Sequence, residues 1–218
     1  MIKKLPRVLI VGDGLSAHVL AHHMHSSGVP FFLHGMDTIG AASPAAWGLL
    51  NPVHFRSFGF SYGASWYPDS LAFYRALEQK LGRNFVDYAP LEHLDARPEA
   101  LAHWSMAWES ELFSFMEKPT MDSLGNVRIV LSQVAMISVP TLLQESRRYL
   151  GEKGLYHQAW FNWPYPDFNH REIIEHAGHR FDAVVWAQGV KSLEAGPFKA
   201  LPIKPSKGEG LHLRTSSQ

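Results

Sequence analysis

Residues 8–17 read VLIVGDGLSA, an apolar run that leads directly into a glycine turn. A helical pattern follows as far as Gly28, and the segment VPFFL at residues 29–33 is typical of a second strand. A strand, a G-x-G-x-x-A turn, a helix and a strand in this order form the βαβ unit that holds a dinucleotide. A glycine turn alone is a weak signal, so the order of the flanking elements carries the prediction.

The residues of the turn have separate expected roles. Gly12 permits the tight turn, Gly14 lets the backbone approach a pyrophosphate, and Ala17 lies where the helix packs closely on the strand. Leu15 and Ser16 fall in the first helical turn, whose free N–H groups and positive dipole end attract phosphate. These five residues are the first candidates for cofactor binding.

The turn departs from the usual pattern in two places. An acidic residue that accepts the adenosine ribose hydroxyls is expected at the end of the second strand, where this chain has Gly35 preceded by His34. Asp37 could reach back, His34 and the backbone could hold the ribose, or affinity could be reduced. No Arg or Lys stands beside this position, so NADP is not favoured. Asp13, inside the turn, is expected to point away from the phosphates, because its charge would repel them.

Composition excludes several classes of protein. The chain has 218 residues, of which 46% are hydrophobic and 18% charged, so it can form a core. Its formal net charge is zero and it contains no basic block, which disfavours nucleic acid as a partner. The absence of cysteine excludes thiol chemistry and fits a cytoplasmic location. The apolar run near the N-terminus is too short for a membrane span.

Further periodic segments alternate along the chain. Helices are expected over residues 68–81, 98–117 and 139–151, and strands over residues 85–95, 127–138, 156–161 and 181–187. Residues 35–66 are rich in Gly, Ser, Ala and Pro and predict loops and short turns. Trp104 and Trp108, at helical spacing, indicate core or a domain interface.

Three segments beyond the glycine turn resemble one known family. ASPAAWGLLNP at residues 42–52, FDAVVWAQG at residues 181–189 and LPIKPSKGEGL at residues 201–211 follow each other in order. They resemble segments of the D-amino-acid oxidase and glycine oxidase superfamily of FAD-dependent oxidoreductases, and the likeness covers about residues 7–213. Arg56 and Trp66 match an arginine and a tryptophan of uncharacterised bacterial members. Members of the family usually run past 300 residues, so the chain resembles a truncated member.

This resemblance implies an α/β fold with a Rossmann-like FAD/NAD(P)-binding domain and a smaller α+β substrate domain. The nucleotide-binding domain would comprise residues 1–85 and 139–196, and the substrate domain residues 86–138. The start of the second half of the substrate sheet would follow at residues 197–218.

The resemblance also implies a function: FAD-dependent oxidation of a C–N bond of a small amine or amino acid by hydride transfer to flavin. The alternatives are a degenerate nucleotide-binding domain without activity and, more weakly, an NAD-dependent dehydrogenase. The implied cofactor contacts, beyond the turn and His34, are Ser43, Ala46, Gly48, Leu49, Ala187 and Gly189. Arg56 and Trp66 are the implied substrate contacts, with an exposed arginine as the plain alternative, and the catalytic residues and oligomeric state are left open.

Other chemistries find less support in the sequence. His18, His22 and His25 share a helix face at a spacing that can bind metal, but a solvated face is the favoured interpretation and no metal is expected. Lys207 and Glu209 fit either a surface pair or a support for the flavin ring. The sequence shows no Ser/His/Asp triad, Walker loop or H-E-x-x-H motif, which agrees with chemistry performed by a cofactor.

Overall fold

The computed structural model describes residues 5–35, 41–159, 174–176, 178–193, 198, 200–202 and 204–205. The chain divides into two compact units, and each is taken by itself below. Unit 1 comprises residues 1–46 and 143–218, and unit 2 comprises residues 47–142. Within the described parts, no helix combines the length and the apolar character that crossing a bilayer requires.

Unit 1 is built on a parallel sheet. Its strands, in spatial order, are β12 (Ala183–Trp186), β1 (Val8–Val11), β2 (Phe31–Gly35) and β9 (Tyr156–Gln158). All three neighbouring pairs run parallel, and Val11 lies between His34 and Trp186 in the register. β1 is buried at every position, as expected for a continuous apolar strand covered on both faces. The predicted α/β class is confirmed.

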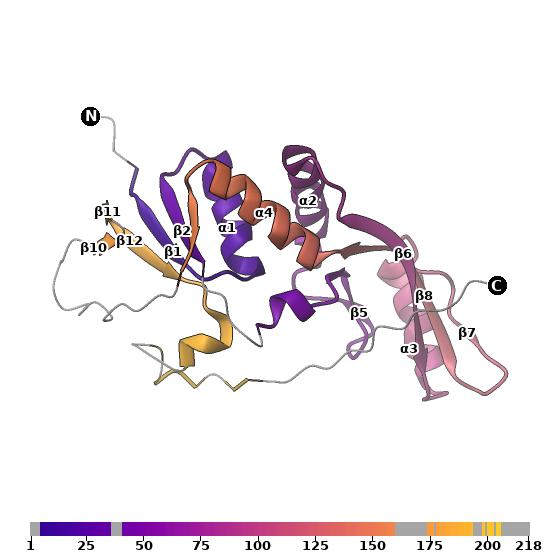
Figure 1. Ribbon diagram of the computed structural model, residues 1–218. Helices are drawn as coiled ribbons and strands as arrows, with labels where there is room; N and C mark the ends of the chain where they lie inside the picture. Colours follow the sequence, from indigo (N-terminus) through magenta and orange to yellow (C-terminus); the bar gives the residue numbers. More distant parts are fainter. Residues whose placement is uncertain are drawn as a thin grey trace, which may run out of the picture. The chain divides into compact units, whose positions relative to one another are not determined.

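Two helices cover one face of this sheet (Figure 1). They are α1 (Leu15–Ser26) and α4 (Val139–Glu152). Ala17 and Ala21 of α1 and Leu150 of α4 are fully buried against the side chains that β1 and β2 point to this face. On the other face, Leu9 and Val11 pack with Phe181 from the hairpin of β10 (Ile174–His176) and β11 (His179–Phe181).

Unit 2 contains an antiparallel sheet. Its path is β3 (Leu49–Leu50), β8 (Val127–Ile137) and β6 (Val86–Asp95), and β7 (Thr120–Met121) also pairs with β8. Trp104 of α3 (Ala100–Ala107) is fully buried in the core beside Ile129 and Leu131, so the Trp104 prediction is confirmed. A hairpin of β4 (Val53–His54) and β5 (Gly59–Phe60) adds Val53 to this core.

Helix α2 (Tyr67–Leu81) belongs to unit 2 and ends at Gly82, whose φ of 68° is the left-handed conformation that favours glycine. Its buried Glu78 joins the helix to β6, because Oε1 accepts hydrogen bonds from the N–H groups of Phe85 and Val86 at 2.6 and 2.7 Å. Arg75 binds the other carboxylate oxygen at 2.7 Å. Burial favours the neutral carboxyl, but these donors outweigh it and hold the pKa of Glu78 below its usual range.

The remaining elements are short. They are η1 (Ser43–Ala45), η2 (Ala64–Trp66), η3 (Trp108–Leu112) and η4 (Gly189–Leu193). The helix expected over residues 98–117 is shorter than predicted, because α3 stops at Ala107 and η3 continues with the wider hydrogen-bond spacing of a π-type turn. The indole N–H of Trp108 donates to the carbonyl of Met116 at 3.2 Å beyond this turn.

The compact units differ from the expected domain boundaries. Residues 47–85 group with unit 2, whereas the sequence placed them with the nucleotide-binding part. The reason is the pairing of β3 with β8, in which Leu49 lies opposite Met136 and Leu50 opposite Ala135. The second boundary falls at Leu142–Leu143, inside α4 and within a few residues of the expected position.

Candidate cofactor site

The glycine turn follows β1 and has a backbone that only glycine adopts readily. Gly12 has a φ of 143°, and a Cβ added there would overlap the carbonyl of Ala187. The N–H of Gly12 donates to the carbonyl of His34 at 3.0 Å, and the N–H of Ala187 donates to that of Val11 at 2.7 Å. The turn is therefore held between the ends of the two strands that flank β1.

The turn leads into the N-terminus of α1. Gly14 precedes the helix, and the N–H of Leu15 donates to Ser43 Oγ at 3.0 Å. The first turn of a helix presents N–H groups without intrahelical acceptors, and Ser43 satisfies one of them from a loop 28 residues away. A Cβ on Gly14 would lie 3.0 Å from the same hydroxyl, so glycine leaves Ser43 room to approach.

A cavity of about 450 Å³ opens at this point of unit 1. The glycine turn, the loop at Ser43 and the end of β12 form its walls. The lining includes Gly12, Gly14, Ser16, Ser43, Ala187, Gly189 and Lys191. It therefore lies at the carboxyl ends of parallel strands, where open α/β sheets bind their ligands.

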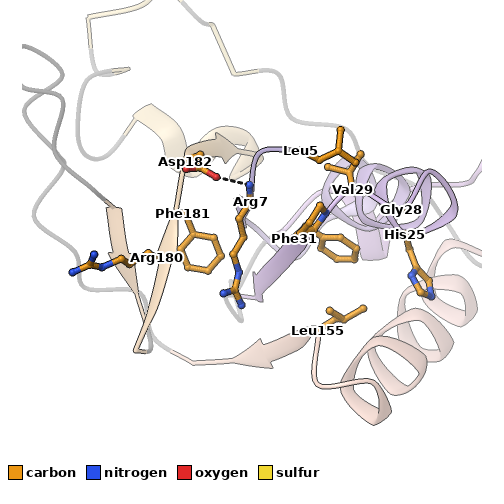
Figure 2. Close-up of a pocket in the computed structure, with 11 residues that line it drawn as sticks. Leu5, Arg7, His25, Gly28, Val29, Phe31, Leu155, Arg180, Phe181 and Asp182 are labelled. Carbon is orange, nitrogen blue, oxygen red and sulfur yellow. Dashed lines mark hydrogen bonds between the residues drawn. The ribbon is translucent and has the colours of Figure 1, made fainter. Parts of the chain in front are cut away.

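A second cavity, of about 770 Å³, lies at the opposite end of the same sheet (Figure 2). Its lining includes Phe31 at the start of β2, Leu155 just before β9 and Phe181 just before β12. Arg7 also lines it, and its guanidinium lies 5.2 Å from the centre of the Phe181 ring. The N–H of Arg7 donates to the Asp182 carboxylate at 2.7 Å. Although larger, this cavity lacks the glycine turn and the helix N-terminus, so the smaller one is the candidate cofactor site.

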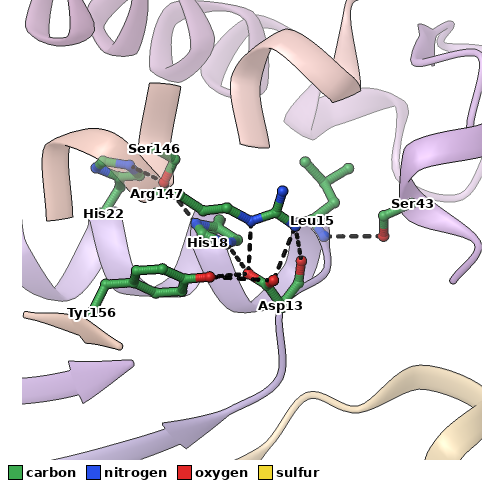
Figure 3. A network of polar contacts seen from close by, with 8 residues as sticks. All are labelled: Asp13, Leu15, His18, His22, Ser43, Ser146, Arg147 and Tyr156. Carbon is green, nitrogen blue, oxygen red and sulfur yellow. Dashed lines mark hydrogen bonds and ion pairs between the residues drawn. The ribbon is translucent and has the colours of Figure 1, made fainter. Parts of the chain in front are cut away.

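Asp13 is the centre of a polar network inside unit 1 (Figure 3). Its Oδ1 contacts His18 Nε2 at 2.8 Å and accepts from Arg147 Nε at 3.1 Å. Its Oδ2 lies 3.0 Å from a terminal nitrogen of Arg147, and the Tyr156 hydroxyl lies 3.3 Å from both carboxylate oxygens. The negative charge that the sequence places in the turn is thus balanced within the protein by Arg147.

The environment of Asp13 keeps its carboxyl ionised. Burial alone would raise the pKa of Asp13, but hydrogen bonds from His18 and Arg147 and the charge of Arg147 together lower it. Burial opposes the charge on Arg147 as well, and Asp13 outweighs it and raises the pKa of Arg147. The pair is a charged contact at neutral pH, directed into the unit rather than left to solvent.

Of the three histidines on the predicted α1 face, His18 and His22 are buried and His25 is half-buried, so the expectation of a solvated face is wrong. His18 is 0% exposed and His22 is 1% exposed, because α4 packs against the side of α1 that does not face the sheet. Ser146 Oγ of α4 lies 2.7 Å from His18 Nδ1 and 2.7 Å from His22 Nε2. Within the described residues, no group of three potential ligands is arranged to hold a metal ion.

Asp13, His18 and Ser146 share the residue types of a hydrolase triad, a contact that the sequence did not reveal. Ser146 is 0% exposed and its hydroxyl is flanked by two imidazoles. A nucleophile must reach a substrate carbonyl. The arrangement therefore serves to join α1 and α4 rather than to attack a substrate.

Replacing Ser146 by alanine tests this role. We expect the free energy of unfolding to fall by about 2 kcal/mol, because two buried imidazoles lose a shared partner. Urea unfolding followed by circular dichroism measures the change. Ser110→Ala is the matched control, since its exposed hydroxyl makes one bond, to the carbonyl of Ala107. Equal losses in the two variants would contradict the role assigned to Ser146.

The end of β2 differs from the expected ribose contact. His34 points to the face of the sheet opposite α1, where its Nε2 contacts the carbonyl of Ala159 at 2.9 Å and its Nδ1 contacts His176 Nε2 at 2.8 Å. Both ring nitrogens are thus engaged within the protein, and burial lowers the pKa of His34. Its carbonyl, rather than its ring, reaches the glycine turn.

The segment at residues 42–52 divides between the two units. Ser43 and Ala46 lie in unit 1, where the N–H of Ala46 donates to the carbonyl of Ser43 at 3.2 Å. Gly48 and Leu49 lie in unit 2. Gly48 has a φ of 66°, and a Cβ there would overlap the carbonyl of Ile137, so its glycine is explained by the approach of β8.

The two expected substrate residues also lie in unit 2, and both are at the surface. Arg56 is exposed, which agrees with the alternative interpretation that it is an ordinary surface arginine. Trp66 is 63% exposed and its ring meets that of Tyr62 edge-on at 6.3 Å.

Comparison with known proteins supports the motif resemblance. No family model matches the chain. Glycine oxidase from Geobacillus kaustophilus matches with a TM-score of 0.61 at 17% identity, over 86% of this chain and 57% of that one. Iminodiacetate oxidase from Chelativorans sp. BNC1 matches with a TM-score of 0.58 at 15% identity, over 86% of this chain and 56% of that one. L-Amino acid deaminase from Proteus myxofaciens matches with a TM-score of 0.58 at 15% identity, over 88% of this chain and 47% of that one.

The chain has the glycine oxidase fold. The resemblance to the D-amino-acid oxidase and glycine oxidase superfamily is thus confirmed at the level of the fold, which is what identities this low can establish. The chain spans about half the length of these solved structures.

Some expected residues of the glycine oxidase fold lie outside the described residues. They are Asp37, Lys207 and Glu209. Of the segment at residues 201–211, the structure describes Leu201, Pro202, Lys204 and Pro205.

The structure adds residues to this glycine oxidase fold that the sequence did not single out. Arg147 and Tyr156 reach the turn from positions 134 and 143 residues beyond Asp13. The one signal for them was indirect: a carboxylate stands in the turn at Asp13, while the usual acid is missing at Gly35.

Proposed function

We propose that the chain binds FAD through unit 1 and serves the oxidation of a C–N bond in a small amine or amino acid. The observation that carries the proposal is the cradle at Gly12, which joins a left-handed glycine, a helix N-terminus and a cavity of about 450 Å³ at the carboxyl ends of the strands. The likeness to the glycine oxidase fold supports FAD over other dinucleotides.

The residues present fit the pyrophosphate of such a cofactor. A Cβ at Gly12 or Gly14 would enter space that the Ala187 backbone and Ser43 already use, so glycine lets these two walls of the cavity pack closely on the turn. The first turn of α1 and the hydroxyl of Ser43 offer hydrogen bonds, and Lys191 lines the same cavity. Gly189, with a φ of 58°, and Ala187 line the opposite wall at the end of β12.

When bound, FAD supplies the hydride acceptor, and the protein supplies binding and orientation. In this proposal the backbone at Gly12, Gly14 and Ser16 holds the pyrophosphate together with the hydroxyl of Ser43, whose oxygen accepts from the N–H of Leu15. Ala46, Gly48 and Leu49 serve the flavin half, and Arg56 and Trp66 serve the substrate. The proposed substrate is a small amine or amino acid, in keeping with the similar glycine oxidase, iminodiacetate oxidase and L-amino acid deaminase.

Thermal unfolding of the chain with FAD, ADP and NAD tests the cofactor. FAD at 100 times its dissociation constant should raise the free energy of unfolding by about 2.7 kcal/mol, because it binds the folded state. NAD should give no comparable shift. The absence of a shift with FAD and with ADP would contradict the proposal.

Reduction of bound flavin tests the chemistry separately. Under anaerobic conditions, glycine or another small amino acid should bleach the flavin absorbance. A chain that binds FAD but whose flavin no amine reduces would instead support the second candidate, a nucleotide-binding domain without oxidase activity. That candidate is favoured by the missing acid at Gly35.

A further inference from the structure

The larger cavity of unit 1, of about 770 Å³, combines a mostly apolar wall with one guanidinium (Figure 2). It lies at the N-terminal ends of the strands, away from the candidate cofactor site. Phe31 and Phe181 are 4% and 3% exposed, so their rings form firm walls, and the half-buried Val29 and Leu155 extend the apolar lining. A cavity of this size, mostly apolar and with a few fixed polar groups, is typical of a small-molecule site.

Arg7 is fixed at this cavity through its backbone. Its N–H donates to the Asp182 carboxylate at 2.7 Å, and its carbonyl accepts from the N–H of Asp182 at 2.8 Å. The next residue, Val8, begins β1, and its N–H donates to the carbonyl of Pro30 at 2.9 Å. The residues that precede β12 and β2 therefore set the point from which the Arg7 side chain starts.

The guanidinium of Arg7 has its hydrogen-bond donors available. It lies 5.2 Å from the centre of the Phe181 ring, a cation–π contact that uses none of its N–H groups. Within the part of the chain that the structure describes, no hydrogen bond or ion pair engages this guanidinium, and Arg7 is half-buried. An anion gains more from a half-buried cation than from an exposed one, because water screens the attraction less.

The other ionisable groups of the lining are directed elsewhere. The Asp182 carboxylate lies at the backbone end of Arg7, and the guanidinium lies at the other end (Figure 2). The Arg180 side chain points away from that of Arg7 (Figure 2). His25 Nε2 contacts the hydroxyl of Tyr149 at 3.1 Å. The cavity therefore presents one forked cation beside aromatic rings, which suits a ligand with a single negative charge.

We propose that this cavity is a second binding site of the chain, for a small organic monocarboxylate with a flat apolar body. The guanidinium of Arg7 donates two parallel hydrogen bonds to the carboxylate, and the apolar body lies against Phe31, Leu155 and Phe181. A single guanidinium favours a monoanion over a phosphate dianion. Because this site and the candidate cofactor site lie at opposite ends of the strands, the inference does not depend on FAD binding.

Titration of the isotope-labelled chain with 3-phenylpropionate and with 3-phenylpropan-1-ol, its uncharged analogue, tests the inference by NMR. The native chain should bind the acid about tenfold more tightly than the alcohol, the yield of a charge-assisted hydrogen bond. Arg7→Met keeps an apolar side chain beside Phe181 and should bind the two equally. Arg7→Lys should keep a reduced preference, since the charge remains and the planar fork is lost. No binding of the acid by the native chain, or an unchanged preference in Arg7→Met, would overturn the inference.

The same spectra locate the acid. The amide signals of Arg7, Phe31 and Phe181 should shift on titration, and those of Gly12 and Gly14 should not. Shifts confined to the two glycines would place the acid in the candidate cofactor site and would contradict a second site. Phenyl phosphate, a dianion of similar shape, should bind no more tightly than 3-phenylpropionate, and much tighter binding would rule out the assignment to a carboxylate.

Two further arginines of unit 1 serve as controls. Arg148 of α4 pairs with Glu145 and Glu152 and is not part of the lining, so Arg148→Met should bind the acid and the alcohol as the native chain does. Arg180→Met removes a charge of the lining whose side chain points away from that of Arg7, so it should keep the preference for the acid. A preference that disappears in Arg180→Met and survives in Arg7→Met would refute the role of Arg7.

Discussion

Replacing Gly12 by alanine is expected to lower the free energy of unfolding by about 3 kcal/mol and to abolish FAD binding. Two effects add at this position. A non-glycine residue is strained at a φ of 143°, and the new methyl group would overlap the carbonyl of Ala187. That carbonyl follows β12, whose register with β1 is fixed by four residue pairs, so it cannot simply move away.

Two other glycines of unit 1 separate the strain from the overlap. Gly154 has a φ of 66° and open space around its Cβ position, so Gly154→Ala should lower the free energy of unfolding by about 1 kcal/mol through backbone strain alone. Gly151 lies in α4, also in open space and without a positive φ, so Gly151→Ala should raise the free energy of unfolding by about 0.5 kcal/mol. Urea unfolding ranks the three variants, and a Gly12→Ala loss no larger than that of Gly154→Ala would rule out the overlap.

Local patterns were sufficient to predict the elements around this turn. The four apolar residues of β1, the glycine turn and the start of α1 lie where the sequence places them, because strand and helix periodicity are properties of neighbouring residues. The end of α2 at Gly82 could equally be predicted from the sequence, since a glycine that follows a helix and adopts a left-handed conformation is a local signal.

The burial of the α1 histidines could not be predicted in this way. A helix face free of large apolar residues is typical of solvent exposure. Here α1 lies against the sheet with Ala17 and Ala21, while α4 covers His18 and His22 from another side. Ser146, 128 and 124 residues further along the chain, supplies a hydrogen-bond partner to both rings, and Asp13 supplies another to His18, which makes the burial of the two rings tolerable.

In the candidate cofactor site, likewise, residues within motifs were predicted and residues brought in from distant parts of the chain were not. Gly12, Gly14 and Ser43 were predicted from motifs, and the structure brings them to one cavity. His34 was named for the ribose, but strand alternation turns its ring to the face opposite α1. Tyr156 and Arg147 come from elements that were predicted as elements, without any indication that they would meet the turn.

Replacing Arg147 by methionine is expected to lower the free energy of unfolding by about 2–3 kcal/mol at neutral pH, because it leaves the Asp13 carboxylate buried without its cation. The estimate is below that for a fully buried pair, since Arg147 is 34% exposed and water partly screens its charge. Methionine keeps most of the aliphatic volume of the side chain.

The stability lost on replacing Arg147 by methionine should decrease as the pH falls. In the folded native chain the pKa of Asp13 is lowered. The ionised carboxyl therefore adds to the free energy of unfolding in full above its pKa of 3.8 in the unfolded chain, and this stabilisation disappears as the pH falls through the lower pKa of the folded chain. Without Arg147, burial is the largest remaining influence and raises the pKa of Asp13, so acid relieves the variant by protonating the carboxyl. The difference from the native chain should therefore shrink as the pH falls from 7 toward about 4.

Arg148→Met is the matched control. Arg148 follows Arg147 on α4 and pairs with Glu145 and Glu152, but it is 51% exposed and water screens its charge, so its loss should leave stability nearly unchanged at any pH. Adding Asp13→Asn to Arg147→Met should recover part of the stability, because the unpaired charge is gone. A loss that is independent of pH and not relieved by Asp13→Asn would show that Arg147 acts through packing, and the ion pair would then not be what holds the glycine turn against α4.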